Sequence, residues 1–152
     1  MGMTLDKDYC FESERLSFRG ITAEDAETIV GWRNNPDNYK NFLNANPITL
    51  ESHLAWFQRY LNDSTRYDFM IIENGKSIGT CGLSAIKNGT CEASYMIGDM
   101  PSRGKGYAKE ALKAVSEVAF TKFGVNRIEL RILPHNLAST RVALGGGSLS
   151  AK

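Results

Sequence analysis

The sequence has few cysteines, no excess of charge of either sign and no long hydrophobic run. Its three cysteines, Cys10, Cys81 and Cys91, are odd in number and lack CxxC spacing, which argues against a disulfide framework or a zinc site. Its 18 lysines and arginines balance 17 aspartates and glutamates, so no overall field draws the protein to nucleic acid or an anionic membrane. No segment approaches the roughly 18 apolar residues of a membrane span, and the N-terminus lacks a signal core. We therefore expect a cytoplasmic protein with no nucleic-acid, membrane or metal partner, and with the cysteines in its core.

The apolar periodicity predicts a single domain over residues 1–152, with a flexible, glycine- and serine-rich tail at 145–152. A period of two indicates strands, and a spacing of three to four indicates helices. The elements follow the order β-α-α-β-β-β-α-β-α, which predicts an α+β fold in which helices pack on a mixed sheet. They comprise a strand at 14–22, a helix after Thr22, a helix from Leu50, strands between 67 and 98, a helix at 107–123, a strand at 126–133 and a short helix after Asn136.

Two Asn-Gly turns dominate the middle of the chain. Asn74-Gly75 and the turn at 87–90 are strong hairpin signals, and they predict a three-stranded antiparallel meander. The strand at 91–98 is joined through a helix to the strand at 126–133, and this connection predicts a parallel pair with a right-handed crossover.

Capping residues mark the starts of the first two helices. Thr22 and Asp25 form a capping-box pattern, and Thr49 is placed to cap the second helix. We expect this second helix to bury a stripe of leucines and a phenylalanine, and to carry its histidine on the surface. The stripe consists of Leu50, Leu54, Phe57 and Leu61, and the histidine is His53.

The segment MPSRGKGYAKEAL, residues 100–112, places glycines and cations directly before an apolar-periodic helix. Gly104 and Gly106 leave room for the backbone to approach a ligand, while Arg103 and Lys105 add positive charge. Because the first N–H groups of a helix attract anions, this turn suits a phosphate, and a diphosphate best. The GxxxxGK[ST] and GxGxxG spacings of nucleotide loops are absent. From this segment alone, a structural turn without a ligand is the alternative.

The pattern Arg103-x-x-Gly106-x-Ala108 resembles the acyl-CoA diphosphate loop, Gln/Arg-x-x-Gly-x-Gly/Ala, of the GNAT superfamily of N-acetyltransferases. The segment 14–37 resembles the opening of the ribosomal-protein-type branch, and HNLASTRVAL resembles the Asn-x-x-Ser segment after the family's fifth strand. WRNN together with ITLESHLAWF is also similar to bacterial aminosugar N-acetyltransferases that act on nucleotide-linked 4-amino sugars. The resemblance covers about residues 12–148 and implies a GNAT-like fold.

This resemblance implies acetyl transfer from acetyl-CoA to a primary amine by direct attack in a ternary complex, without a metal. The acceptor is a small molecule or a peptide: a nucleotide-linked aminosugar, a protein N-terminus, or a polyamine or drug. The cofactor-binding residues implied lie at the end of one strand, in the loop and at one later position. They are Met96, Ile97, Gly98, Arg103, Gly104, Lys105, Gly106, Tyr107, Ala108 and Asn136.

The resemblance also implies catalytic and acceptor-binding positions. The main-chain N–H of Ile97 is the candidate donor to the oxyanion, and Glu92 is the first candidate for a general base, ahead of Ser94 and Tyr95. Either Ser139 or water assists the departing thiolate, or the thiolate leaves without a dedicated acid. The acceptor-binding residues expected on the first helix and on the strand are Trp32, Arg33, Asn34 and Tyr95.

The sequence departs from the family pattern in two places. Ala143 occupies the position of the tyrosine that protonates the thiolate in many relatives, and the chain stops at Lys152, where relatives continue into two further strands. We therefore expect a sheet edge beginning at residue 126 that a second subunit covers in a homodimer, or an incomplete acceptor site. The alternative functions are a catalytically impaired CoA-binding protein of the GNAT fold and a sugar- or peptide-binding module that uses the aromatic helices alone.

Overall fold

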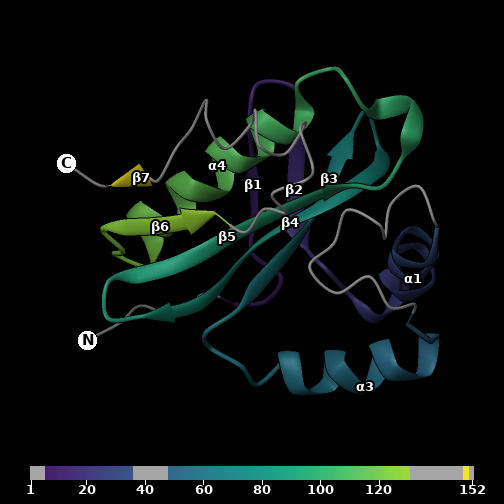
Figure 1. Cartoon of the computed structure of the whole chain (residues 1–152), viewed down its shortest axis with the longest axis horizontal. Coiled ribbons are helices and arrows are strands. Elements are labelled where there is room, and N and C mark those ends of the chain that lie inside the picture. The colour runs from purple at the N-terminus through teal and green to yellow at the C-terminus, as the bar shows by residue number, and fades with distance from the viewer. Residues whose placement is uncertain (1–5, 36–47, 131–148, 151–152) are drawn as a thin grey trace.

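The computed structural model describes residues 6–35, 48–130 and 149–150, and these form a mixed sheet with helices on both faces (Figure 1). The sheet has seven strands in chain order, and every neighbouring pair is antiparallel except β5 and β6, which are parallel. The predicted α+β fold is confirmed. The strands are Cys10–Glu12 (β1), Ser17–Gly20 (β2), Tyr67–Glu73 (β3), Lys76–Lys87 (β4), Thr90–Ile97 (β5), Arg127–Leu130 (β6) and Leu149–Ser150 (β7).

Three α-helices cover the described sheet. They are Ala26–Asn34 (α1), Leu50–Tyr60 (α3) and Tyr107–Lys122 (α4). Two short 3₁₀ turns, Ala23–Asp25 (η1) and Met100–Ser102 (η2), precede α1 and α4 respectively. Because α4 connects the parallel strands β5 and β6, the predicted parallel pair is confirmed, while the right-handed course of the connection stays a prediction.

The meander of β3, β4 and β5 forms as its turns predict. Asn74 and Gly75 have φ values of 50° and 79°, and Asn88 and Gly89 have φ values of 54° and 79°. Two consecutive residues with positive φ define the hairpin turn that matches the twist of the flanking strands. Both predicted hairpins are therefore confirmed.

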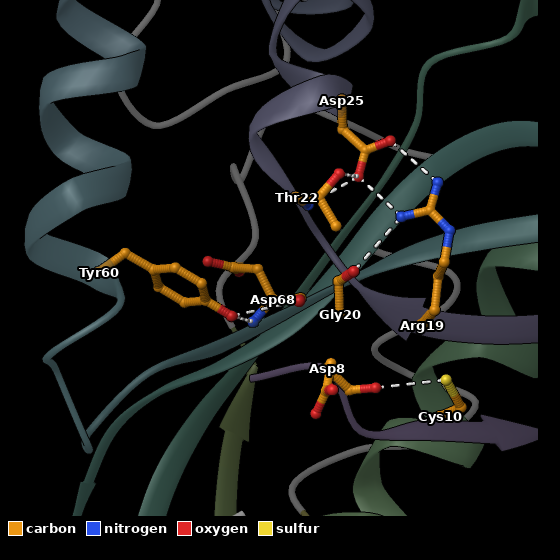
Figure 2. Close-up of polar contacts among 8 residues, drawn as sticks. All are labelled: Asp8, Cys10, Arg19, Gly20, Thr22, Asp25, Tyr60 and Asp68. Atoms are coloured by element: carbon orange, nitrogen blue, oxygen red, sulfur yellow. Dashed lines mark hydrogen bonds and ion pairs between the residues drawn. The ribbon is translucent and has the colours of Figure 1, made fainter. Parts of the chain in front are cut away.

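The predicted helix caps also form. Thr49 accepts a hydrogen bond from the Ser52 N–H at 2.9 Å, and the Thr22 N–H donates to the Asp25 carboxylate at 2.8 Å. The guanidinium of Arg19 binds both carboxylate oxygens of Asp25, at 2.8 and 2.9 Å (Figure 2). Burial alone would raise the pKa of Asp25, but the bonds from Arg19 and Thr22 outweigh it and hold that pKa below its usual value. The cap thus ties the start of α1 to β2.

Two separate apolar clusters lie on the two faces of the sheet. On one face, α4 packs against alternate residues of the central strands, including Tyr67, Phe69 and Ile71 of β3. On the other face, α1 and α3 pack over Met70 through a smaller cluster. Because side chains alternate along a strand, Asp68 and Met70 face α1 and α3. Each face therefore has its own core.

The second helix buries a different face from the predicted stripe. Leu50 and Leu61 are exposed, at 38% and 43% of their surfaces, whereas His53, Phe57 and Tyr60 are buried. The predictions of a core position for the two leucines and of a surface position for His53 are therefore wrong. Positions 53, 57 and 60 follow the i, i+4, i+7 spacing equally well, so periodicity alone did not decide which row of side chains faces the sheet.

The cysteines divide between core and surface. Cys81 and Cys91 are buried, as predicted, but Cys10 is exposed on the edge strand β1, and all three are free thiols. Burial raises the pKa of Cys91 to about 11, and therefore the Cys91 thiol stays protonated at neutral pH.

The last described residues pair with the sheet. Leu149 and Ser150 form β7, antiparallel to Ile128 and Arg127 of β6. The prediction that residues 145–152 form a flexible tail with no further strand is therefore wrong at these two positions; the other tail residues lie outside the described part. β7 gives β6 a strand neighbour, and the homodimer expected to cover that edge stays a prediction.

Candidate functional site

The strand β5 ends in a fixed turn that leads to α4. The N–H groups of Gly98 and Asp99 both donate to the Ile78 carbonyl of β4, at 2.9 and 3.0 Å. The Asp99 carboxylate then accepts from the Ser102 hydroxyl at 2.6 Å and lies 3.2 Å from the Lys76 ammonium. The bonds from Ser102 and Lys76 hold the pKa of Asp99 below its usual value. These contacts fix the direction in which the chain leaves the sheet.

Two glycines form the turn into α4. Gly104 and Gly106 have φ values of 78° and 80°, in the left-handed region that favours glycine. Gly106 caps α4 without a side-chain hydrogen bond to the first turn, while Gly104 and Lys105 are exposed. The predicted basic glycine turn therefore opens a 16-residue helix, with its backbone near solvent.

The backbone of Ile97 faces away from β4. In an antiparallel ladder, successive residues direct their N–H and C=O groups to opposite neighbours. Because Gly98 donates to Ile78 of β4, Met96 also faces β4 and Ile97 faces the opposite side. On that side, the pairing of β5 with β6 extends from Thr90 to Ala93. The Ile97 N–H is thus better placed than that of Gly98 for a contact outside the sheet.

Arg103 lies between the end of β5 and the glycine turn. Its Nε donates to the Ile97 carbonyl at 3.1 Å, and its side chain is half-buried. The structure therefore brings together three of the sequence-predicted cofactor positions, Ile97, Arg103 and Gly106, at one end of the sheet.

Trp32 connects α1 to this end of the sheet. A methyl side chain placed on Gly98 would lie 2.3 Å from two atoms of the Trp32 ring, so only glycine allows this contact. Arg33, the next residue, is half-buried, and burial together with the charge of Arg66 lowers its pKa. Asn34 has a structural contact: its amide bonds the N–H and the C=O of Ile48, at 2.7 and 2.6 Å. Of the predicted acceptor residues, Trp32 thus lies beside the end of β5. Arg33 instead interacts electrostatically with Arg66 and Asp68, and Asn34 binds the backbone at the start of α3.

A polar cluster that the sequence did not single out lies under α3. The Asp68 carboxylate binds Arg66 Nε at 2.7 Å, and the Tyr60 hydroxyl accepts from the Asp68 N–H at 2.8 Å (Figure 2).

Trp56 contacts both His53 and Arg66. Its ring centre lies 5.4 Å from that of His53 and 5.1 Å from the Arg66 guanidinium. Burial lowers the pKa of His53, and the charge of Arg33 adds to this effect. An aspartate inside the apolar run YDFMII was the available signal for this cluster.

The candidate bases on β5 divide between the two faces. Glu92 pairs with Ser84 and Ser94 pairs with Gly82, which in turn pairs with Asp68 on the face of α1 and α3. Tyr95 alternates to the other face and packs against the core under α4. Glu92 therefore shares a face with the predicted acceptor helices, and Tyr95 does not.

A second group of residues that the sequence analysis missed holds the glycine turn from the side. Ser13 and Arg15, in the loop between β1 and β2, bind Glu110 in the first turn of α4. These residues are about 95 positions apart in the sequence, so no local pattern linked them. The remaining predicted positions, Asn136 and Ser139, lie outside the described residues.

Within residues 6–35, 48–130 and 149–150, no helix is long and apolar enough to span a bilayer. The same residues hold no group of three or more histidine, cysteine, aspartate and glutamate side chains arranged to bind a metal ion.

Known proteins resemble the chain in sequence. It is 31% identical over 138 residues to the uncharacterized N-acetyltransferase p20 of Bacillus licheniformis, covering 86% of this chain and 76% of that protein. It is 25% identical over 128 residues to the acetyltransferase PseH of Campylobacter jejuni, covering 79% of this chain and 74% of the relative.

The fold matches solved structures as well. Spermidine N-acetyltransferase from Vibrio cholerae, solved in complex with CoA and spermine, superposes with a TM-score of 0.81 at 18% identity, over 89% of this chain and 81% of that one. The family model for the acetyltransferase (GNAT) domain matches residues 15–147, which is most of the sequence. The chain therefore belongs to the GNAT family of acetyltransferases.

Proposed function

We propose that this protein transfers an acetyl group from acetyl-CoA to a primary amine by direct attack in a ternary complex. The observation that carries the proposal is the position of two left-handed glycines, Gly104 and Gly106, which open α4 beside the end of β5. A diphosphate there would accept hydrogen bonds from the first N–H groups of the helix and would meet the positive end of its dipole. The GNAT neighbour that holds CoA supports acetyl-CoA as the donor.

The end of β5 would hold the reacting part of the donor. The Ile97 backbone faces away from β4, so it can pair with the amides of the pantetheine arm as an added strand would. In the reaction, the amine nitrogen forms a bond to the thioester carbon, the C–S bond breaks and CoA leaves as a thiolate. The Ile97 N–H is the candidate donor to the oxygen that becomes negative during this step.

The amine must lose a proton as it attacks. Glu92 lies on the face of β5 that α1 and α3 cover, four residues before Met96, which is about 13 Å along a strand. A base at this distance reaches the amine only through a chain of several water molecules. Replacing Glu92 by Gln should lower kcat and leave the affinity for acetyl-CoA unchanged.

We assign the amine acceptor to the side of the sheet that carries Trp32, Arg33 and Trp56. Aromatic faces and a half-buried guanidinium suit a sugar joined to a nucleotide, because rings stack on bases and arginine binds phosphate. This agrees with the resemblance of WRNN and ITLESHLAWF to aminosugar N-acetyltransferases. A nucleotide-linked aminosugar is thus the first acceptor to test, and a protein N-terminus is the second.

A thermal-shift measurement tests the cofactor. Acetyl-CoA should raise the melting temperature of the wild type, and Arg103→Glu should abolish the rise because it places a negative charge beside the diphosphate. Lys113→Glu is the matched control, since Lys113 is an exposed cation of α4 farther along the helix. An equal loss in both variants, or no shift in the wild type, would contradict the proposal.

A free-thiol assay tests the reaction. Acetyl-CoA is incubated with a nucleotide-linked 4-amino sugar, a peptide with a free N-terminus, and a polyamine. Thiol release with at least one amine is expected. Binding of acetyl-CoA without thiol release from any amine would instead favour the impaired CoA-binding protein.

A further inference from the structure

We infer that Arg15 is a positioning residue for the diphosphate loop, and that Ser13 and Glu110 hold it in place; this inference rests on the proposed binding of acetyl-CoA. We call Ser13, Arg15 and Glu110 the clasp. It joins the loop between β1 and β2 to the first turn of α4, and these two segments lie side by side (Figure 1). None of the three residues belongs to the glycine motif.

The clasp is a connected set of charge-assisted hydrogen bonds. Arg15 Nε binds Glu110 Oε1 at 2.6 Å, and the Arg15 N–H donates to Glu110 Oε2 at 2.8 Å. The Ser13 hydroxyl donates to the same Oε2. The guanidinium also lies 4.5 Å from the centre of the Tyr107 ring. Its orientation is thus determined from several sides, although 44% of the Arg15 side chain is exposed.

The oriented guanidinium fixes one peptide plane of the loop. Arg15 Nη1 donates to the Lys105 carbonyl at 2.9 Å, and Nη2 lies 3.4 Å from the position that a Cβ on Gly106 would occupy. In a trans peptide the C=O and the following N–H point in opposite directions. The Gly106 N–H therefore points away from Arg15, toward the exposed side of the loop.

The next peptide plane is fixed by the helix. The Gly106 carbonyl accepts the Glu110 N–H at 3.1 Å, so the N–H of Tyr107 points out of the helix N-terminus. Arg15 thus holds the peptide directly before the one that the helix holds, and two adjacent N–H groups are oriented before a diphosphate arrives. Preorganised donors bind more tightly because they lose less conformational freedom on binding.

The clasp also pairs the negative charge of Glu110 with a positive charge. Glu110 lies in the first turn of α4, where its carboxylate would repel a bound diphosphate. Arg15 neutralises that carboxylate, and its hydrogen bonds together with that of Ser13 hold the pKa of Glu110 below its usual value despite partial burial. Removing Arg15 would release one peptide plane and leave a negative charge near the site.

Steady-state kinetics of Arg15→Ala with three donors test the inference. KM for acetyl-CoA and for acetyl-dephospho-CoA should rise about tenfold or more, with kcat nearly unchanged, because both donors carry the diphosphate. KM for acetyl-pantetheine, which has no diphosphate, should not change. Adding Glu110→Gln to Arg15→Ala should recover part of the affinity by removing the repulsion.

Two further variants keep the test decisive. Arg127→Ala removes an arginine of another exposed ion pair, with Glu129 at 2.8 Å, and should leave every KM unchanged. Arg15→Lys keeps the charge but cannot bond Glu110 and Lys105 in the same fork, so it should show an intermediate KM even if Arg15→Ala folds poorly. Wild-type KM values in Arg15→Ala, an equal rise with acetyl-pantetheine, or a rise with acetyl-CoA alone would overturn the inference. A wild type that binds none of the donors would overturn the proposed function as well.

Discussion

The two faces of the sheet differ in the kind of side chains that are buried between the sheet and its helices. Among the residues that the structure describes, 17 buried residues form one apolar cluster on the α4 face, whereas the cluster under α1 and α3 has five. The second face instead carries buried polar side chains, including Asp25, His53 and Asp68. Apolar burial stabilises the fold without direction, while buried polar groups must each meet a partner in a defined geometry.

This difference matches the two tasks of an acyltransferase. In the proposed function, the α4 face supports a loop that would bind the diphosphate through backbone N–H groups, and these need only a rigid helix behind them. The opposite face carries Trp32 and Arg33, which we propose as acceptor-binding side chains. The comparison leads to three predictions, from the largest expected effect to the smallest.

A matched pair of core truncations measures the difference directly. Phe69→Ala on the α4 face should lower the free energy of unfolding by about 3–5 kcal/mol, because the completely buried ring leaves a cavity in a continuous core. Phe57→Ala on α3 should cost about 2 kcal/mol, because the smaller cluster there can relax around the missing ring. Urea unfolding of both variants provides the two values. Equal losses of unfolding free energy in the two variants would contradict the expected difference between the two apolar clusters.

A pair of glycine substitutions tests the contact between α1 and the end of β5. Gly98→Ala should destabilise the protein by about 2 kcal/mol and raise KM for the amine, because the new methyl group forces Trp32 from its place. Gly31→Ala, in the same helix as Trp32, meets nothing within 4 Å and should stabilise α1 by about 0.5–1 kcal/mol. Thermal unfolding measures the stability of both variants, and steady-state kinetics measure their KM for the amine. An unchanged KM in Gly98→Ala would show that Trp32 does not contribute to acceptor binding.

The pH dependence of stability tests the polar contacts of the second face. Because the folded-state pKa of Asp25 lies below its unfolded value, Asp25 stabilises the protein above about pH 4, and this contribution is lost as the pH falls through the folded pKa. Asp25→Asn should therefore cost about 1 kcal/mol at neutral pH, and its stability should decrease less than that of the wild type on acidification. Arg19 is partly exposed, which keeps the effect small.

Urea midpoints at several pH values measure this dependence. Glu51→Gln, which removes an exposed carboxylate of α3 away from the Arg19–Asp25 pair, is the control, and the difference expected between Asp25→Asn and the wild type should not appear with it. Parallel pH curves for Asp25→Asn and the wild type would mean that the Arg19–Asp25 pair contributes no pH-dependent stability.

Features that depend on neighbouring residues were predictable. The Asn-Gly hairpins, the Thr22 and Thr49 caps and the left-handed glycines before α4 follow from local backbone sterics and hydrogen bonds. The parallel β5–β6 pair followed from the helix that connects the two strands, because a connection of this length joins parallel neighbours.

Features that depend on distant segments were predicted less well. The stripe assigned to α3 was right at Phe57 but wrong at Leu50 and Leu61, because two rows of that helix have helical spacing and only contact with the sheet selects one. The edge pairing of β7 was missed because a glycine- and serine-rich composition carries no signal for a two-residue bridge. The face of Tyr95 depends on the register of β5 against β4.

The sequence by itself determined the order of the elements from β2 to β6, the turns between them and the basic glycine loop at the start of α4, because each rests on interactions within a few residues. It predicted neither the short strand β1 nor β7. Only the tertiary structure decided what surrounds that loop. It brought Arg15 to the Lys105 carbonyl and Trp32 to Gly98. Contacts between segments far apart in the chain depend on how the helices and strands pack, and neither composition nor periodicity encodes that packing.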